Sequence, residues 1–192
     1  MNLDQVLAFH CAPTIGGLKP ANLIAHQKIV SNNNIIDTVN SLNRKGVFLE
    51  KLWESKYKEL TLIFNKDLLL SSLESPEIWG YLLVQGYPMY SNLDAIISHL
   101  KTRISKNGSF PHEVGLFLGY PLVDVLGFIK NKGRNCKICG YWKVYGDEQE
   151  ARCLFDSYSK ARDEMCAQVQ NGFSVVDILN AESTLYLERR VI

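Results

Sequence analysis

Apolar positions at the start of the chain recur every three or four residues. Leu3, Val6 and Leu7 follow this spacing, which predicts a short helix over residues 2–10. A proline and two glycines come soon afterwards, so this helix is expected to end in a loop that carries Pro13.

Two further helices are predicted before residue 47. Lys19 and Pro20 are expected to open the first, because proline suits the first turn of a helix, where a missing N–H leaves no bond unmade. The second is expected over residues 35–44, with Gly46 closing it.

The periodicity then changes to that of strands. Residues 47–53 and 60–64 are rich in β-formers, and the polar run between them predicts an antiparallel hairpin. Residues 140–145 form a third candidate strand, flanked by glycines. A two-stranded ribbon is marginal alone, so this distant segment is expected to join the hairpin in one sheet.

Helices dominate the rest of the pattern. They are predicted over residues 67–73, from the start signal at 75–77, over 91–104 and over 147–170. In the last of these, Asp147 precedes Glu150 by three residues, which is a capping-box pattern. The chain is therefore expected to adopt an α+β fold, a mainly helical single domain over residues 1–192 with a small antiparallel sheet of about three strands.

Composition and charge narrow the classes of function. Hydrophobic residues make up 46% of the 192 residues and charged residues 21%, as in globular proteins. The net charge of +1 provides no basic face to displace counterions from nucleic acid, so a nucleic-acid partner is not expected. No apolar stretch approaches the roughly 20 residues of a membrane-spanning helix, so no membrane partner is expected either.

The cysteines and the first residues bear on the compartment. No basic stretch followed by an apolar run opens the chain, so no signal peptide is expected. The five cysteines are an odd number and are expected to be free thiols in a reducing cytoplasm.

Cys11 is the first candidate for chemistry. It is predicted where a helix gives way to a loop, which would leave the thiol reachable. A thiolate nucleophile needs a group that lowers its pKa, commonly a histidine. The adjacent His10 is the weaker partner, because side chains next to each other in sequence seldom pair well. The alternative is that Cys11 is a small buried hydrophobic residue.

His112 and Glu113 are the second candidate. Pro111 suits the first turn of a helix, and the positive end of that helix would favour a neutral imidazole, the form that a general base or metal ligand requires. Glu113 would orient the ring or bind a cation. The alternative is a helix start without chemistry.

Two motifs carry less weight. Cys136 and Cys139 form a CxxC, but it precedes a predicted strand instead of a helix, and no second pair of zinc ligands follows. Residues 113–125 have the rhythm of a helix-turn-helix, yet the second helix is apolar where a recognition helix would be polar and basic, which predicts a buried helix pair. No phosphate loop, dinucleotide fingerprint or serine elbow supports ATP, NAD or serine-hydrolase chemistry.

Three blocks of the sequence are distinctive in combination. They are HCAPT at 10–14 with KPAN at 19–22, FPHEVGLFLGYP at 110–121, and GYWKVYG at 140–146. In these blocks the chain resembles a family of bacterial proteins, mainly from Firmicutes, catalogued as a domain of unknown function. The resemblance spans nearly the whole chain and implies a cytosolic bacterial protein. It also implies that Cys11, His112 and Glu113 belong to the family pattern and that Cys136 does not.

Three hypotheses of function follow. The first is a thiol-dependent enzyme, such as an acyl hydrolase or transferase, with Cys11 as nucleophile, His112 as base and Glu113 as orienting group. The second is a metal- or haem-binding protein that uses these residues or His10. The third is a non-enzymatic binding or regulatory module, whose partner would be a small molecule or a protein. The sequence specifies no cofactor.

Overall fold

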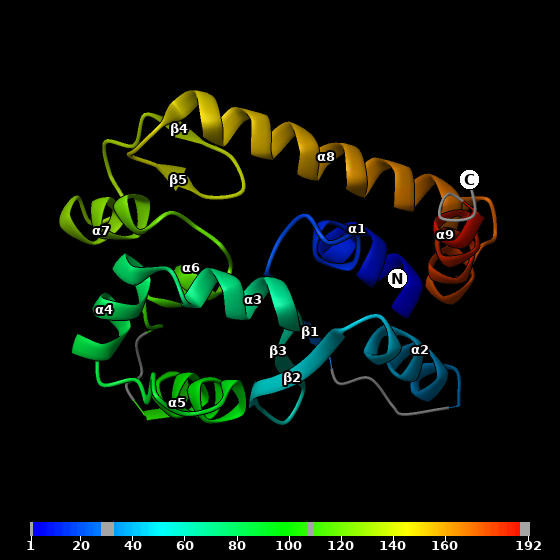
Figure 1. Ribbon diagram of the computed structural model, residues 1–192, viewed down its shortest axis with the longest axis horizontal. Helices are drawn as coiled ribbons and strands as arrows, with labels where there is room; N and C mark the ends of the chain where they lie inside the picture. Colours follow the sequence, from blue (N-terminus) through cyan, green and yellow to red (C-terminus); the bar gives the residue numbers. More distant parts are fainter. Residues whose placement is uncertain (1, 28–32, 107–109, 189–192) are drawn as a thin grey trace.

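A three-stranded antiparallel sheet lies at the centre of the computed structural model, which describes residues 2–27, 33–106 and 110–188 (Figure 1). The strands are β1 (Ala21–Gln27), β2 (Val47–Glu54) and β3 (Lys58–Asn65), in the order β1-β3-β2. The central strand β3 is buried on both faces over residues 61–64, so its apolar run needs helices on each side of the sheet.

The β2–β3 hairpin confirms the prediction for residues 47–53 and 60–64. The Ser55 hydroxyl closes its turn by accepting hydrogen bonds from the backbone N–H groups of Tyr57 and Lys58. The polar residues of the turn lie outside the apolar run of the central strand, which fixes the register of the pair.

The prediction of a helix at Lys19 and Pro20 is wrong, because these residues lead into β1. Ala21 pairs with Phe64 on the free edge of β3, and the Pro20 carbonyl accepts a hydrogen bond from Asn65 N–H. Proline is compatible with the position just before a strand, where it interrupts no ladder bond.

The prediction that residues 140–145 join the sheet is also wrong. They lie in a separate ribbon of β4 (Ile138–Cys139) and β5 (Lys143–Val144). β1 already occupies the third place in the sheet. The ribbon is stabilised instead by burying Trp142 and Val144 in a small cluster with Ala151 and Tyr158.

The predictions of helices over residues 35–44, 67–73, after 75–77, over 91–104 and over 147–170 are confirmed. The helices are α1 (Leu3–Ile15), α2 (Asn33–Arg44), α3 (Lys66–Leu73), α4 (Pro76–Val84), α5 (Leu93–Lys106), α6 (Val114–Phe117), α7 (Leu122–Lys130), α8 (Glu148–Gln170) and α9 (Val175–Glu188). The Asp147 side chain caps α8 by accepting a hydrogen bond from Glu150 N–H.

α1 is longer than its predicted range. It continues through Cys11 and Pro13 to Ile15, and Gly16 N–H closes it on the Ala12 carbonyl. Every residue from 11 to 15 is buried, and α1 packs against α8. This tertiary burial outweighs the loss of the one intrahelical hydrogen bond that Pro13 cannot donate. Cys11 therefore lies inside the helix, and the expected loop begins only after Ile15.

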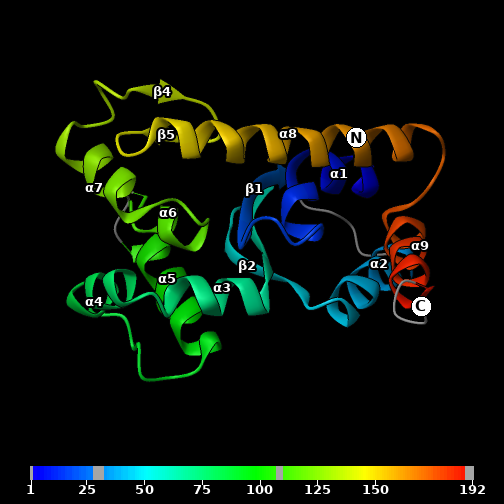
Figure 2. The same ribbon diagram turned by 45° about the horizontal axis from the view of Figure 1, so that its top comes forward.

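Alternate residues of β3 divide the core into two layers. Leu62 and Phe64 belong to a cluster formed with α3, α4, α5 and α6, whereas Ile63 belongs to a cluster formed with α1, α2 and α9. α8 runs along one side of the molecule, with the β4–β5 ribbon and α7 near one end and α9 at the other (Figures 1 and 2). The expected α+β fold with a small antiparallel three-stranded sheet is confirmed.

Among the described residues, none of the helices combines the length and apolar character needed to span a membrane.

Candidate functional site

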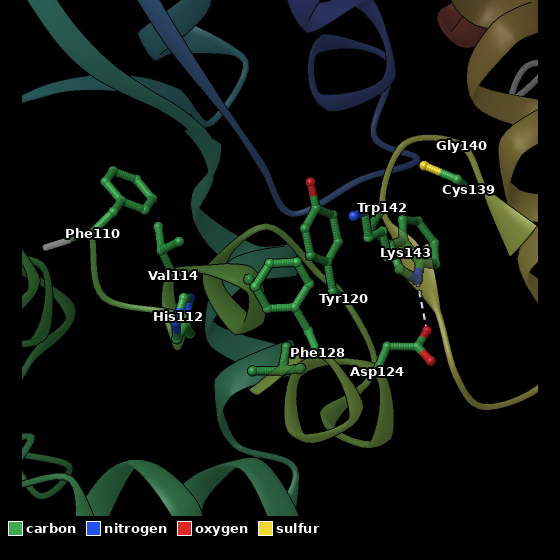
Figure 3. A pocket seen from close by; sticks show the side chains of 12 residues that line it. Phe110, His112, Val114, Tyr120, Asp124, Phe128, Cys139, Gly140, Trp142 and Lys143 are labelled. Carbon is green, nitrogen blue, oxygen red and sulfur yellow. Dashed lines mark hydrogen bonds between the residues drawn. The ribbon is translucent and has the colours of Figure 1, made fainter. Parts of the chain in front are cut away.

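The best candidate site is a pocket of about 360 Å³ between α6, α7 and the β4–β5 ribbon. Aromatic rings form much of its wall. Figure 3 shows Phe110, His112 and Val114 on one side of the Phe128 ring, with Tyr120 and Trp142 on the other. The remaining lining residues are Gly115, Asp124, Val125, Cys139, Gly140 and Lys143.

The turn between α6 and α7 places Tyr120 in this wall. Gly119 has a φ of +77°, and a Cβ there would lie 2.6 Å from the Pro20 ring, so both the backbone conformation and the packing require glycine. Tyr120 N–H then bonds to the Gly115 carbonyl. The expected buried helix pair is confirmed for α6, but Val123 and other apolar residues of α7 are exposed.

Asp124 joins α7 to the ribbon. Its buried carboxylate accepts hydrogen bonds from the Trp142 indole at 2.6 Å, from Tyr145 N–H at 2.6 Å and from Gly146 N–H at 2.7 Å. Three donors satisfy most of the capacity of this carboxylate, so its role is to hold the pocket wall. Sequence reasoning missed Asp124; the available signal was an acidic residue inside the apolar segment 122–129.

A buried lysine lies behind the aromatic wall. Tyr120 stacks on Trp142 at 4.9 Å, and Lys19 Nζ is 5.5 Å from the centre of the Tyr120 ring and 5.9 Å from that of Tyr158. Burial lowers the pKa of Lys19 to about 8 and raises the pKa of Tyr120 to about 12, with a smaller contribution from Tyr158. Sequence reasoning also missed Lys19, since nothing in its local pattern indicates burial.

His112 lies in the pocket, as an exposed residue whose ring is 5.3 Å from that of Phe128. α6 begins only at Val114, so His112 and Glu113 belong to the turn that leads into the helix. The prediction that Pro111 opens a helix holding both residues is therefore wrong, and a helix of one turn provides little dipole at its start.

Glu113 has a different environment, although it is the next residue. It is buried, forms an ion pair with Arg103 of α5 and accepts a hydrogen bond from the Tyr87 hydroxyl at 3.2 Å. It does not line the pocket. Burial, with a contribution from Glu113, raises the pKa of Tyr87. Glu113 therefore anchors the turn to α5 and is engaged with groups other than His112.

Cys11 is fully buried in the cluster formed with α2 and α9, beside Leu7 and Ala8. Burial raises the pKa of its thiol to about 12, against an opposing effect of Lys19. Cys11 does not line the pocket, so the structure does not bring it into the same cavity as His112. His10 is exposed and packs its ring against Phe9.

The CxxC contributes one residue to the pocket. Cys139 is exposed and lines the cavity, and Cys136 is half-buried. Within the described parts of the chain, no group of three or more His, Cys, Asp or Glu side chains is arranged to hold a metal ion.

Comparison with known proteins identifies the family. The chain matches the model of the family described as "Protein of unknown function (DUF3793)" over residues 7–179. No curated protein and no solved structure matches it. The match covers both layers of the core, the sheet and every residue of the pocket, and the protein therefore belongs to the DUF3793 family.

Proposed function

We propose that this protein is a small-molecule-binding module, and that its ligand is a flat, mainly apolar molecule with an anionic group. The observation that carries this proposal is the aromatic pocket of about 360 Å³. Binding sites for small molecules are mostly apolar clefts of this size with a few well-placed polar groups. Rings such as Phe128 and Trp142 favour planar ligands because they stack.

The charges around the pocket favour an anion. Lys143 donates one hydrogen bond from Nζ, to the Gly133 carbonyl at 2.7 Å, and an ammonium has three donors. The imidazole of His112 offers a further polar contact. The carboxylate of Asp124 is already occupied by three N–H donors, so it opposes an anion less than a free carboxylate would.

Of the three sequence-based hypotheses, this geometry favours the binding module. The enzyme hypothesis needs a reachable thiolate at Cys11, and the buried position of that thiol disfavours ionisation. The same burial keeps Cys11 from an external metal or haem. We also propose that the protein is cytoplasmic, because free thiols such as its five cysteines persist in a reducing compartment.

The proposal is tested with two fluorescent probes, anilinonaphthalene sulfonate and its uncharged relative N-phenylnaphthylamine. Both should bind with saturable fluorescence at one site per chain. Lys143→Gln should weaken binding of the sulfonate about fivefold and leave the uncharged probe unchanged, because only the sulfonate meets the ammonium. Phe128→Ala should weaken binding of both probes.

Lys66→Gln is the matched control, because Lys66 is an exposed lysine on α3, outside the pocket. Urea unfolding of each variant separates loss of the pocket from loss of the fold. Non-saturable binding, or binding that Phe128→Ala leaves unchanged, would show that the pocket is not the ligand site.

A further inference from the structure

Cys139 occupies a position in the pocket that the binding proposal does not use. Cys139 is exposed and lines the cavity, opposite His112 in the view of Figure 3. In the β4–β5 ribbon it is paired directly with Lys143, and residues opposite each other on an antiparallel pair have neighbouring side chains. An exposed thiol on the wall of a pocket is within reach of a small-molecule disulfide, and thiol–disulfide exchange depends on such access.

A second thiol lies three residues away. Cys136 is half-buried, and only Lys137 and Ile138 separate it from Cys139 in the chain. The backbone between them bends into the ribbon, where Lys137 N–H bonds to the Val144 carbonyl. The pair therefore combines an accessible thiol with a less accessible one, as an attacking and a resolving cysteine would be arranged.

We propose that Cys139 and Cys136 form a thiol–disulfide exchange site on the pocket wall, which reacts with small-molecule disulfides and alters the pocket when it is oxidised. The chemical step is independent of the proposed function, and only its effect on ligand binding rests on that function.

The exchange proceeds in two balanced steps. The Cys139 thiolate attacks one sulfur of the disulfide; that S–S bond breaks, and the leaving thiolate takes up a proton as a free thiol. Cys136, after losing its proton to water, then attacks Cys139 Sγ and releases the second thiol. The two cysteines lose two electrons, and the small disulfide gains them. Excess thiol reverses both steps.

Oxidation should change the pocket because of how the ribbon is held. On the far side of Cys139, a Cβ at Gly140 would collide with the Phe155 ring, so this backbone is closely packed against α8. The backbone movement that accompanies disulfide closure is therefore expected in residues 136–139. Lys143 is paired with Cys139, so the movement shifts the ammonium that faces the ligand.

The test treats the whole protein with oxidised glutathione and maps the cysteines by mass spectrometry. Trypsin cuts after Lys137, which separates Cys136 from Cys139, so a disulfide leaves the two fragments joined. We expect joined fragments without glutathione. Cys136→Ser should instead accumulate glutathione on Cys139, because the resolving thiol is missing. Cys153 is the internal control: it is an exposed thiol on α8 and should keep any glutathione it acquires.

Two outcomes would overturn the exchange site: modification of Cys139 no faster than that of Cys153, or glutathione that remains on Cys139 in the wild-type chain. The oxidised protein should also bind anilinonaphthalene sulfonate about fivefold more weakly than the reduced one, an effect that Cys136→Ser/Cys139→Ser abolishes. Equal binding by both forms would overturn the effect on the pocket. If the probe binds neither form, the binding function fails, while the mapping still decides the exchange site.

Discussion

Asp124 illustrates how one residue can determine the shape of the pocket. A buried carboxylate with three N–H donors is stabilising only while all its partners remain in place. The Trp142 indole donates to one oxygen, and two backbone N–H groups donate to the other. An amide in its place would keep one acceptor oxygen and would turn an N–H group toward the backbone donors or the indole.

Asp124→Asn should therefore destabilise the fold by about 2 kcal/mol, as measured by urea unfolding. In a Trp142→Phe background, where the indole donor is already absent, the same change should cost less. Asp156→Asn, on an exposed part of α8, is the control and should be nearly neutral. Equal costs of Asp124→Asn in the two backgrounds would show that the indole bond contributes nothing.

Among elements, the turn between α6 and α7 depends most on a single position. Gly119→Ala combines a left-handed φ with a contact of 2.6 Å to Pro20, whereas Gly86→Ala has a similar φ of +85° and no atom within 4 Å. The first change should cost about 2 kcal/mol more than the second in urea unfolding, because only it adds a clash. Equal costs would show that Pro20 yields easily. Weaker binding of N-phenylnaphthylamine should accompany the Gly119 change, since the turn places Tyr120.

Some helices and strands of this protein are predictable from local sequence, and others are not. The hairpin and the helices predicted over 35–44, 67–73, 91–104 and 147–170 follow from periodicity and caps that lie within each segment, such as Asp147 before α8. No helix over α9 is predicted from the sequence. β1 was predicted as a helix because its strand character depends on pairing with the free edge of β3, which local pattern does not encode. The sequence predicts the candidate site in part, because His112 lines the pocket. The roles of Asp124 and Lys19 depend on partners that are far away in the sequence, and only the structure identifies them.

For the molecule as a whole, the buried Lys19 should couple stability to pH. Burial lowers its pKa in the folded state to about 8, against 10.5 for an ordinary lysine. Between these values the unfolded chain binds the extra proton, so stability rises with pH; the full cost of the buried charge is present below pH 8. Cys11 acts in the opposite sense: its pKa is raised from 9.0 to about 12, so it reduces stability as the pH passes 9.

Comparison of Lys19→Met with the wild-type chain isolates the lysine, since Cys11 is common to both. Between about pH 7 and about pH 9, the wild-type protein should gain roughly 1.4 kcal/mol relative to the variant in urea unfolding. Lys66→Met, at an exposed position, should retain the wild-type dependence. Parallel curves for Lys19→Met and the wild type would mean that the folded protein does not hold Lys19 at a lowered pKa.

The sequence by itself determined the fold class, the hairpin and most of the helices, because hydrophobic period, caps and turn residues act over a few neighbouring positions. The sequence also places the chain in its family, through the match of residues 7–179 to the family model. Only the tertiary structure decided that Cys11 is buried, that Glu113 binds Arg103, and that Cys139 joins His112 around one pocket. Those outcomes depend on which surfaces meet between elements far apart in the chain, and burial and pairing of that kind are properties of the packed molecule.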